Sequence, residues 1–406
     1  MRLFLLALRN LTRNKRRTLI TALAVLFGAL AIVVLRGFAN GFTESLIETA
    51  IESKVGAVQV FKKGYIGSDD PLKMSLPHDP ALIARIKAVP GVVEVAPRID
   101  FDGMVGNGSE ATMFMATAIE PELEYKVCPK RQTRVSPGSE PLAPSKGAGE
   151  ADALVGKTLA ESLGAGKGAT LVMQAAGPHA STNALDVEVH GFLPTQSIAE
   201  SKRMATVRIG FAQDLLRMKG QVTQYVIGVS DLQQAAPVAA RLRAALGEGY
   251  EVTTWAQLDP MTKTRVASMG YVLFFIALVL ALLVATGIVN TMLMSVYERV
   301  REIGTMLALG VRRWQVTMLF LWEAMALGLL SALCGAGLGL LIVRLISRNG
   351  LRFHPPGGDP LAIYPSVDPM FFVGVIGFAL VGAVLSALYP AWKAARLRPV
   401  DALRAT

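Results

Sequence analysis

Cysteine and histidine are scarce in this 406-residue chain, which has two cysteines and four histidines. Cys128 lies in a polar segment and Cys334 in a long apolar one, so the two are not expected to form a disulfide. The histidines show no spacing typical of metal ligands; they are His78, His179, His190 and His354. No metal-binding residue is therefore predicted.

Catalytic motifs are lacking as well. The chain contains no Gly-x-Ser-x-Gly elbow and nothing that indicates a Cys–His nucleophile pair. Gly156-Lys157-Thr158 ends like a phosphate-binding loop, but that pattern needs a glycine five residues before Gly156, where the chain has Ala151. We therefore expect no catalytic residue and no cofactor on this chain.

Charged residues are almost absent from four long apolar runs. The runs are Thr18–Leu35, Met269–Tyr297, Val316–Val343 and Pro369–Trp392, and Glu323 is the one charged residue among them. A helix needs about 20 apolar residues to cross a bilayer. The first run is the shortest, but the residues that follow it keep a helical periodicity and can lengthen its helix beyond the membrane. With a mean hydropathy of +0.43, the chain is too apolar for an ordinary soluble enzyme. We predict a membrane protein with four transmembrane α-helices and a large α+β periplasmic domain between the first and second spans.

The net charge of +10 is concentrated beside the apolar runs. Residues 1–17, 298–313 and 393–406 hold 14 basic and three acidic residues, whereas residues 37–268 hold 23 basic and 25 acidic residues. Because short basic loops stay in the cytoplasm, we predict both termini and the middle basic segment there, and the long polar segment outside. The excess charge fits contact with anionic membrane lipid and leaves no large basic face for nucleic acid.

The membrane part is expected to consist of short segments in a fixed order. They are an amphipathic cytoplasmic helix (1–17), a first span and stalk (18–54), a stalk and second span (255–297), a cytoplasmic helix (298–314), a third span (315–344), a periplasmic loop (345–368), a fourth span (369–392) and a cytoplasmic tail (393–406). Small residues in the third span predict close helix packing at Ser331, Gly335 and Gly339. The glycines of the fourth span are expected to form a second packing seam; they are Gly374, Gly377 and Gly382.

The periplasmic domain is expected to span residues 55–254. Two β-α-β units flank its middle, with strands at 58–61, 92–96, 224–229 and 250–255 and helices at 80–87 and 237–246. We predict one α+β subdomain built from 55–120 and 204–254, with a β-rich subdomain inserted at 121–203. The insert contains a proline-rich loop at 127–152, a helix at 156–163 and strands at 170–174 and 185–191, and a further strand follows it at 204–209.

A short charged segment, 298–314, joins the second and third spans. We expect a small rigid helix that ends at Gly310, with Arg312 beginning the next element. An alternative is a loop that only fixes membrane topology. Glu323 is the one acidic residue within the spans. It could relay a proton or contact a substrate, or it could pair with a basic residue or a neighbouring backbone group, and we favour pairing.

Two stretches resemble a known family. ERVREIGTMLALGVRRWQVTMLFLWEA and YPAWKAARLRPVDALR are similar to the FtsX/MacB-type permease domain of ABC transporters. The outer segments ALVGKTLAESLGAGKGATL, VEVHGFL and FAQDLLRM resemble the family's periplasmic domain, and VTTW points to its lipoprotein-releasing LolC/LolE branch. The similarity covers the whole chain, including the order of one span, a large outer domain and three further spans.

The resemblance implies that two permeases, either two copies or a copy and a paralogue, bind two cytoplasmic ATPase subunits. ATP and Mg would be bound by those subunits, because this chain lacks the ATPase that is fused to MacB. Residues 298–310 would form the coupling helix that seats in a groove of the ATPase. Its candidate coupling residues are Glu298, Arg299, Arg301, Glu302, Ile303, Gly304, Leu307, Leu309 and Gly310.

Three functions follow from the resemblance, all for a non-catalytic subunit of a bacterial inner membrane complex. The first is release of lipoproteins toward the outer membrane, with a periplasmic carrier recruited by a loop for which 192–203 is the candidate. The second is MacB-like efflux of small molecules or peptides from the periplasm. The third is FtsX-like regulation of a cell-wall hydrolase, without transport.

Overall fold

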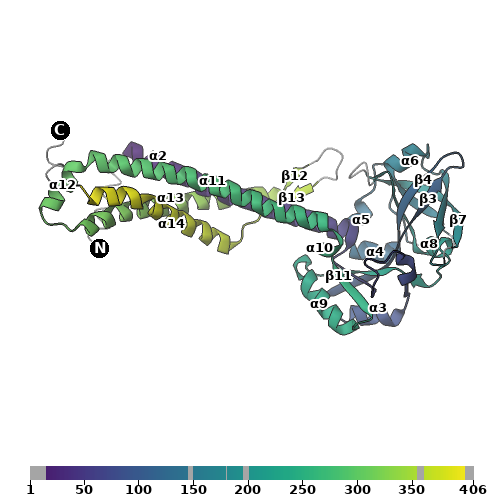
Figure 1. Ribbon diagram of the computed structural model, residues 1–406. Helices are drawn as coiled ribbons and strands as arrows, with labels where there is room; N and C mark the ends of the chain where they lie inside the picture. Colours follow the sequence, from purple (N-terminus) through teal and green to yellow (C-terminus); the bar gives the residue numbers. More distant parts are fainter. Residues whose placement is uncertain (1–14, 145–149, 180, 195–200, 354–360, 398–406) are drawn as a thin grey trace. The chain divides into compact units, whose positions relative to one another are not determined.

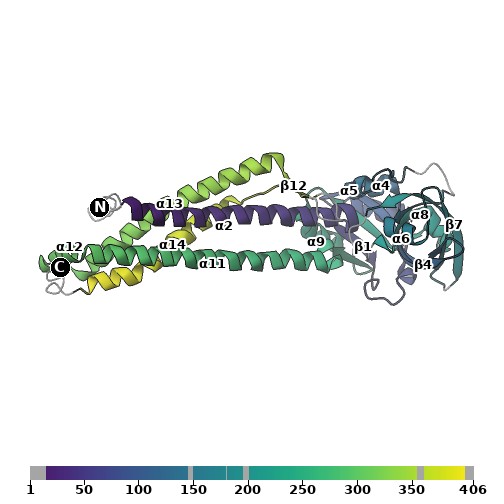
Figure 2. The same cartoon turned by 90° about the horizontal axis from the view of Figure 1, so that it is seen from above.

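The computed structural model describes residues 15–144, 150–179, 181–194, 201–353 and 361–397 (Figures 1 and 2). The chain forms two compact units, each described here by itself. The membrane unit consists of residues 1–44, 266–351 and 362–406, and the outer unit consists of residues 45–265 and 352–361. Residues 1–14 of the amphipathic helix expected at 1–17, and residues 195–200 of the loop expected at 192–203, lie outside the described residues.

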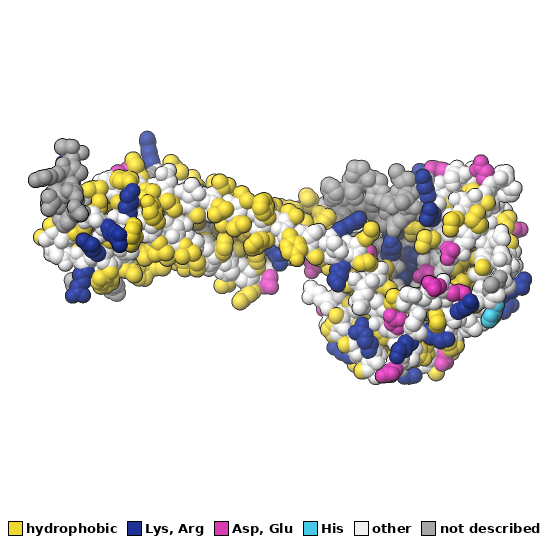
Figure 3. Space-filling model, viewed as in Figure 1, with side chains coloured by type: hydrophobic (Ala, Val, Ile, Leu, Met, Phe, Trp, Pro, Cys, Tyr) yellow, Lys and Arg dark blue, Asp and Glu magenta, His cyan; other side chains and the backbone are white. Residues whose placement is uncertain are grey.

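Among the described residues, four helices are long and apolar enough to cross a membrane: α2 (Lys15–Ala50), α11 (Pro260–Glu298), α13 (Arg313–Asn349) and α14 (Pro369–Ala395). Apolar side chains cover most of the visible surface of this unit (Figure 3). The predicted membrane protein with four spans and an α+β domain between the first two is therefore confirmed. Helices α2 and α11 have 36 and 39 residues, so each continues well beyond the ~20 residues that cross a bilayer.

Small residues bring the membrane helices together. A Cβ atom added at Gly335 would overlap the carbonyl oxygen of Leu26, and one at Gly339 would lie 3.0 Å from the Cβ of Val33. Helix α13 therefore packs against α2 through these glycines, and Ser331 is buried on the same helix. The packing seam predicted for the glycines of α14 is not present among the described residues. A Cβ atom added at Gly374, Gly377 or Gly382 would have no neighbour within 4 Å.

The outer unit is built on one nine-stranded sheet in the order β11-β1-β10-β3-β4-β8-β5-β7-β6. The first four strands are β11 (Tyr250–Thr254), β1 (Val58–Lys62), β10 (Gln224–Val229) and β3 (Val92–Gly106). Helices α3 (Pro80–Lys87) and α9 (Ala235–Leu246) contribute Leu82, Ile86, Val238 and Leu242 to the same core as these strands. Strands from both ends of the domain thus share one sheet, as their patterns predict.

The remaining strands close into a ring. They are β4 (Ala111–Ile119), β8 (Met204–Arg208), β5 (Asp152–Gly156), β7 (Thr182–Leu193) and β6 (Thr170–Ala176). An additional pairing of β6 with the C-terminal part of β3, where Gly103 lies opposite Ala175, completes a six-stranded barrel. Closure leaves no free edge in this part of the sheet, which protects it from pairing with other chains.

The expected subdomain boundaries differ from this arrangement. Strands β4 and β8 were assigned to the α+β subdomain, but β4 pairs with β8 and β8 pairs with β5, so both belong to the barrel. Strand β3 belongs to both parts, because its N-terminal half pairs with β10 and its C-terminal half with β6. The β-rich region is therefore an extension of the same sheet rather than a separate insert.

Short elements complete the chain. The helices are η1 (Ile51–Val55), η2 (Pro71–Met74), α4 (Pro121–Val127), α5 (Pro129–Thr133), α6 (Lys157–Ser162), α8 (Ile209–Leu215), η3 (Leu232–Gln234), α10 (Trp255–Leu258) and α12 (Val300–Ala308). The short strands are β2 (Leu76–Pro77), β9 (Gln221–Val222), β12 (Leu351–Phe353) and β13 (Leu361–Ile363). The stretch expected as a loop at 127–152 thus holds the end of α4, helix α5 and the first residue of β5.

A buried ion network joins β3, α4 and η1. Arg98 donates to Glu124 (Nε to Oε2, 2.9 Å) and to the carbonyl oxygen of Lys54 (2.8 Å), and Arg131 donates to Glu124 at 2.7 Å. Burial alone would raise the pKa of the Glu124 carboxyl, but the charges of Arg98 and Arg131 outweigh it and lower the pKa. The carboxylate is therefore ionised at neutral pH and holds the three elements together.

Candidate functional site

Helix α12 is a separate nine-residue helix between the ends of α11 and α13. Gly310 ends it with a positive φ of 90°, and the backbone N–H of Val311 donates to the carbonyl oxygen of Met306 at 3.0 Å. Arg312 is the N-cap of α13, where its backbone N–H donates to the side chain of Gln315 at 2.9 Å. The expected short helix, its end at Gly310 and the restart at Arg312 are all present.

One face of α12 is built into the membrane unit. Ile303 is 1% exposed and Gly304 is also buried. Ile303 belongs to an apolar cluster with residues of α11, α13 and α14, which are Val296, Val316, Phe320, Ala391, Ala394 and Ala395. Burial of this cluster fixes α12 against three membrane helices, so a displacement of α12 is passed to them directly.

The opposite face of α12 is exposed. It carries Arg301, Thr305 and Ala308, followed by Leu309 and Arg312. Leu309 is 85% exposed, the highest value among the large hydrophobic side chains of the described residues. An apolar side chain with basic neighbours on a projecting turn is typical of a protein contact surface.

The nine candidate coupling residues therefore fall into three groups. Ile303 and Gly304 face inward and are not available to a partner, whereas Glu298, Arg301, Leu309 and Gly310 are exposed. Arg299, Glu302 and Leu307 are partly buried at the border. The 3.6-residue period of a helix could have separated the inward from the outward residues, but the neighbours that bury them could not be read from the sequence.

Arg299 connects α12 to the membrane helices by charge. Its guanidinium lies 3.1 Å from the Glu302 carboxylate and 3.5 Å from that of Glu323, and the Glu323 side chain is 6% exposed. Glu323 therefore pairs with a basic residue, which was the favoured alternative. A buried carboxylate with a nearby guanidinium is far less unfavourable than an unpaired one.

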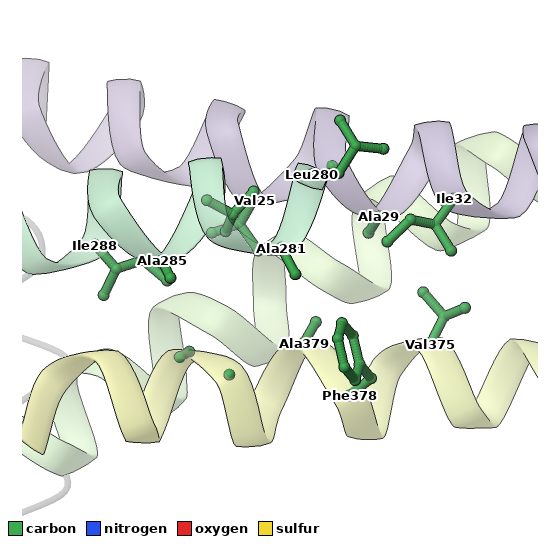
Figure 4. A pocket seen from close by; sticks show the side chains of 14 residues that line it. Val25, Ala29, Ile32, Leu280, Ala281, Ala285, Ile288, Val375, Phe378 and Ala379 are labelled. Atoms are coloured by element: carbon green, nitrogen blue, oxygen red, sulfur yellow. The ribbon is translucent and has the colours of Figure 1, made fainter. Parts of the chain in front are cut away.

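A second candidate site is an apolar pocket of about 70 Å³ within the membrane unit. Figure 4 shows its lining from three helices: Val25, Ala29 and Ile32 of α2, Leu280, Ala281, Ala285 and Ile288 of α11, and Val375, Phe378 and Ala379 of α14. Many of the lining residues are glycine or alanine, so the space arises because short side chains leave the helices incompletely packed. Small apolar residues of this kind were not recognised as a site from the sequence.

A neighbouring pocket of about 230 Å³ shares Ile32 with the first and is lined by Arg36, Phe274 and Phe371, among others. The guanidinium carbon of Arg36 lies 5.3 Å from the centre of the Phe371 ring. Its buried Nε has no hydrogen-bond acceptor among the residues that the structure describes. The two pockets together offer apolar lining with one positive charge.

No group of three or more His, Cys, Asp or Glu side chains that could hold a metal occurs among the described residues.

Comparisons with known proteins agree with this architecture. The model of the MacB-like periplasmic core domain matches residues 18–245, and that of the FtsX-like permease C-terminal domain matches residues 274–399. A macrolide export ATP-binding/permease protein MacB from Marinobacter nauticus is 24% identical over 98% of this chain and 60% of its own length. A MacB from a Shewanella species is 26% identical over the same shares.

The chain thus spans about 60% of the length of these curated relatives. Among solved structures, the periplasmic region of MacB from Actinobacillus actinomycetemcomitans is similar, at 9% identity and a TM-score of 0.36 over 53% of this chain and 94% of that one. The order of four spans, the outer domain and the matched ranges agree with one another, and the chain belongs to the family of FtsX-like permeases with a MacB-like periplasmic core domain.

Proposed function

We propose that this chain is the permease subunit of an ABC transporter and that α12 is the helix through which a cytoplasmic ATPase moves it. The observation that carries the proposal is the two-sided environment of α12. Ile303 fixes one side to three membrane helices, while Leu309 and its basic neighbours project from the other. A partner that binds the exposed side of α12 would move the membrane helices without deforming α12.

In this proposal the ATPase is a separate chain, present in two copies, and it binds ATP and Mg. The termini and α12 lie in the cytoplasm and the outer unit lies in the periplasm of a bacterium. This orientation is supported by the excess of basic residues in the short segments 1–17, 298–313 and 393–406 that flank the spans. The permease pairs with a second copy or a paralogue. The long helices α2 and α11, which join the membrane part to the outer unit, carry the motion outward.

For the cargo, we propose lipoproteins that are released from the inner membrane, with a periplasmic carrier receiving them. The apolar pockets between α2, α11 and α14 support a cargo with acyl chains, and Arg36 supports an anionic group beside them. MacB-like efflux is the second candidate, favoured by the names of the curated relatives. FtsX-like regulation of a cell-wall hydrolase is the third, and it would need no pocket.

The coupling proposal is tested by affinity purification of the chain from its own cells in a mild detergent, followed by mass spectrometry. We expect an ABC ATPase to follow the wild-type chain, and Leu309→Asp to reduce its recovery at least tenfold, because a charge replaces an apolar contact. Leu345→Asp, an equally polar change at an exposed residue of α13 away from α12, is the matched control. Recovery of no ATPase with the wild-type chain would refute the proposal.

The cargo proposal is tested by filling the pocket. Ala285→Phe places a ring in it, whereas Leu283→Phe changes an exposed position of the same helix. In proteoliposomes with the ATPase, we expect Ala285→Phe to abolish stimulation of ATP hydrolysis by a diacylated lipoprotein and Leu283→Phe to leave it intact. Equal stimulation of both variants would exclude this pocket, and stimulation only by a soluble macrolide or a hydrolase would favour the second or third function.

A further inference from the structure

Four methionines lie next to one another on the outer face of the barrel. Met104 of β3 is paired with Met113 of β4, and Met115 of β4 is paired with Met204 of β8. Paired side chains lie on the same face of a sheet, and Met113 and Met115 share that face because they are two residues apart. The four side chains form one continuous group across three neighbouring strands, which we call the methionine patch.

The methionine patch faces solvent. Met104, Met113 and Met115 are 41%, 54% and 62% exposed, and Met204 is partly exposed. As the structure describes the barrel strands, none of their other exposed positions carries a leucine, an isoleucine or an aromatic residue. Protein contact surfaces are usually anchored by tryptophan or tyrosine, which these positions lack. The property that the members of the patch share is therefore their sulfur atom.

Strand geometry brings these sulfurs within reach of one ion. Opposite residues on antiparallel strands have Cβ atoms about 4.5–5.5 Å apart, and residues two apart on one strand are separated by about 7 Å. Because the methionine side chain is unbranched and flexible, the thioethers of Met113 and Met115 can turn toward each other between those of Met104 and Met204. Asp102, exposed and paired with Met115, adds a negative charge nearby.

The chemistry of a thioether restricts the ions that it binds. Soft sulfur ligands select Cu(I), whereas magnesium, calcium and manganese prefer oxygen. In the oxidising periplasm, where the proposed function places the outer unit, two thiols can be lost to a disulfide, but a thioether cannot form one. A thioether also carries no proton that an incoming ion must displace.

We propose that the methionine patch binds Cu(I), with Met113 and Met115 as the central ligands and Met104 and Met204 beside them. The ion enters and leaves as Cu(I), so no electron is transferred. The site belongs to the barrel alone. It goes beyond the proposed function, since neither the coupling through α12 nor any of the three candidate functions requires it.

The first test measures Cu(I) binding to the full chain, purified in a mild detergent, by competition with bicinchoninate under a reductant. A Cys334→Ser background removes the exposed thiol, and the remaining Cys128 is buried. We expect Met113→Leu/Met115→Leu to lower the affinity at least tenfold, because leucine keeps the volume but has no sulfur. Met261→Leu, at an exposed methionine outside the barrel, is the matched control and should leave the affinity unchanged.

Further measurements identify the ligands. Met104→Leu/Met204→Leu should weaken binding at least threefold, because only two of the four sulfurs remain. X-ray absorption by the Cu(I)-loaded chain should show sulfur ligands alone. The affinity should change by less than about threefold between about pH 7 and pH 5, since a thioether binds no proton, whereas a histidine site would release its ion as the ring is protonated.

Three results would each overturn the inference. They are equal affinities of the background chain and its Met113→Leu/Met115→Leu variant, nitrogen or oxygen ligands in the absorption spectrum, and a chain that takes up no Cu(I) but whose variant loses a co-purified protein, which would make the patch a protein contact. Equal thermal midpoints of the variants are expected and separate lost binding from unfolding. Cu(I) binding is measured without the ATPase, so failure of this site and failure of the proposed function are distinguishable.

Discussion

The guanidinium of Arg299, at the start of α12, lies 3.5 Å from the carboxylate of Glu323 inside α13. Arg299 also holds Glu302 on α12 itself, so one side chain joins the exposed helix to a buried acid of the span. Sequence pattern alone left open whether Glu323 serves chemistry or structure. Its partner indicates that it positions α12.

We predict that Glu323→Gln loosens α12 without unfolding the chain. Removal of one partner leaves Arg299, 15% exposed, with a weaker acceptor, and we expect a loss of about 1–3 kcal/mol in the stability of the membrane unit. ATP hydrolysis by the complex should continue while its coupling to work outside the membrane falls. The measurement is the thermal midpoint in detergent together with cargo-stimulated ATP hydrolysis.

The double variant Arg299→Met/Glu323→Leu is the control for Glu323→Gln. It removes both charges of the buried pair, so neither is left without the other, and Glu302, which also loses Arg299, is 39% exposed. We therefore expect the double variant to regain much of the lost stability. A Glu323→Gln variant that is as stable and as well coupled as the wild type would show that the ion pair has no role.

The packing of α13 on α2 gives a second prediction. Gly335→Ala should destabilise the membrane unit by about 1–3 kcal/mol, because its methyl group would overlap the Leu26 carbonyl and force the helices apart. Gly337→Ala, two residues away, should be neutral or slightly stabilising, because nothing lies within 4 Å and alanine is the better helix former. Thermal unfolding of the two variants side by side checks this, and equal midpoints would contradict it.

The network around Arg98 gives a third prediction, which concerns the outer unit. Glu124→Gln leaves the buried guanidinium of Arg98 without its main counter-ion, and we expect the free energy of unfolding of the outer unit to fall by about 3–5 kcal/mol at neutral pH. Glu122→Gln, at an exposed position of the same helix, should change little. Calorimetry in detergent compares the unfolding transitions of the two variants, and equal transition temperatures would mean that the network adds no stability.

The same carboxylate predicts an acid-sensitive fold. Because the pKa of Glu124 is lowered in the folded chain, its contribution is complete above the unfolded pKa of about 4.3 and disappears as the pH falls through the lower, folded pKa. The wild-type outer unit should therefore lose stability below about pH 4 more steeply than Glu124→Gln, which cannot titrate there. Parallel stability–pH curves would exclude Glu124 as the group responsible.

Cys128 belongs to this network and gives a fifth prediction. Burial raises the pKa of its thiol to about 11, so it is protonated at neutral pH and enclosed. In the Cys334→Ser variant, a polar maleimide should label Cys128 only after denaturant is added. Rapid labelling of the folded chain would mean that the α4 region opens readily.

Much of the architecture could be predicted because the signals are local. Apolar length gave the four spans, and the bounds of α3 and β10 matched the expected Pro80–Lys87 and Gln224–Val229. Strand β3 was expected to end at Ala96, yet it continues through Pro97 to Gly106. Pro97 lies opposite Tyr225 in the pairing with β10, a long-range register that no local pattern reveals.

Other features were missed for two different reasons. Strand β4 has a readable alternation from Ala111 to Ala118, with Phe114, Ala116 and Ala118 buried and the residues between them exposed or half-exposed, and a period-two pattern would have found it. The closure of the barrel by β3 and β6 could not be read, because it depends on pairing between residues about 70 positions apart. The same holds for the neighbours that bury the inner face of α12, which are residues of α11, α13 and α14.

Strand β3 is the one strand shared by the open four-stranded part of the sheet and the closed barrel. For the two parts to separate, β3 must lose either its hydrogen bonds to β10 or those to β4 and β6, and under a load directed along the strand the bonds of one pairing are sheared together rather than opened one after another. Shear of many bonds at once resists force far better than unzipping. Under such a load the outer unit should therefore yield at its short peripheral strands before its two halves come apart.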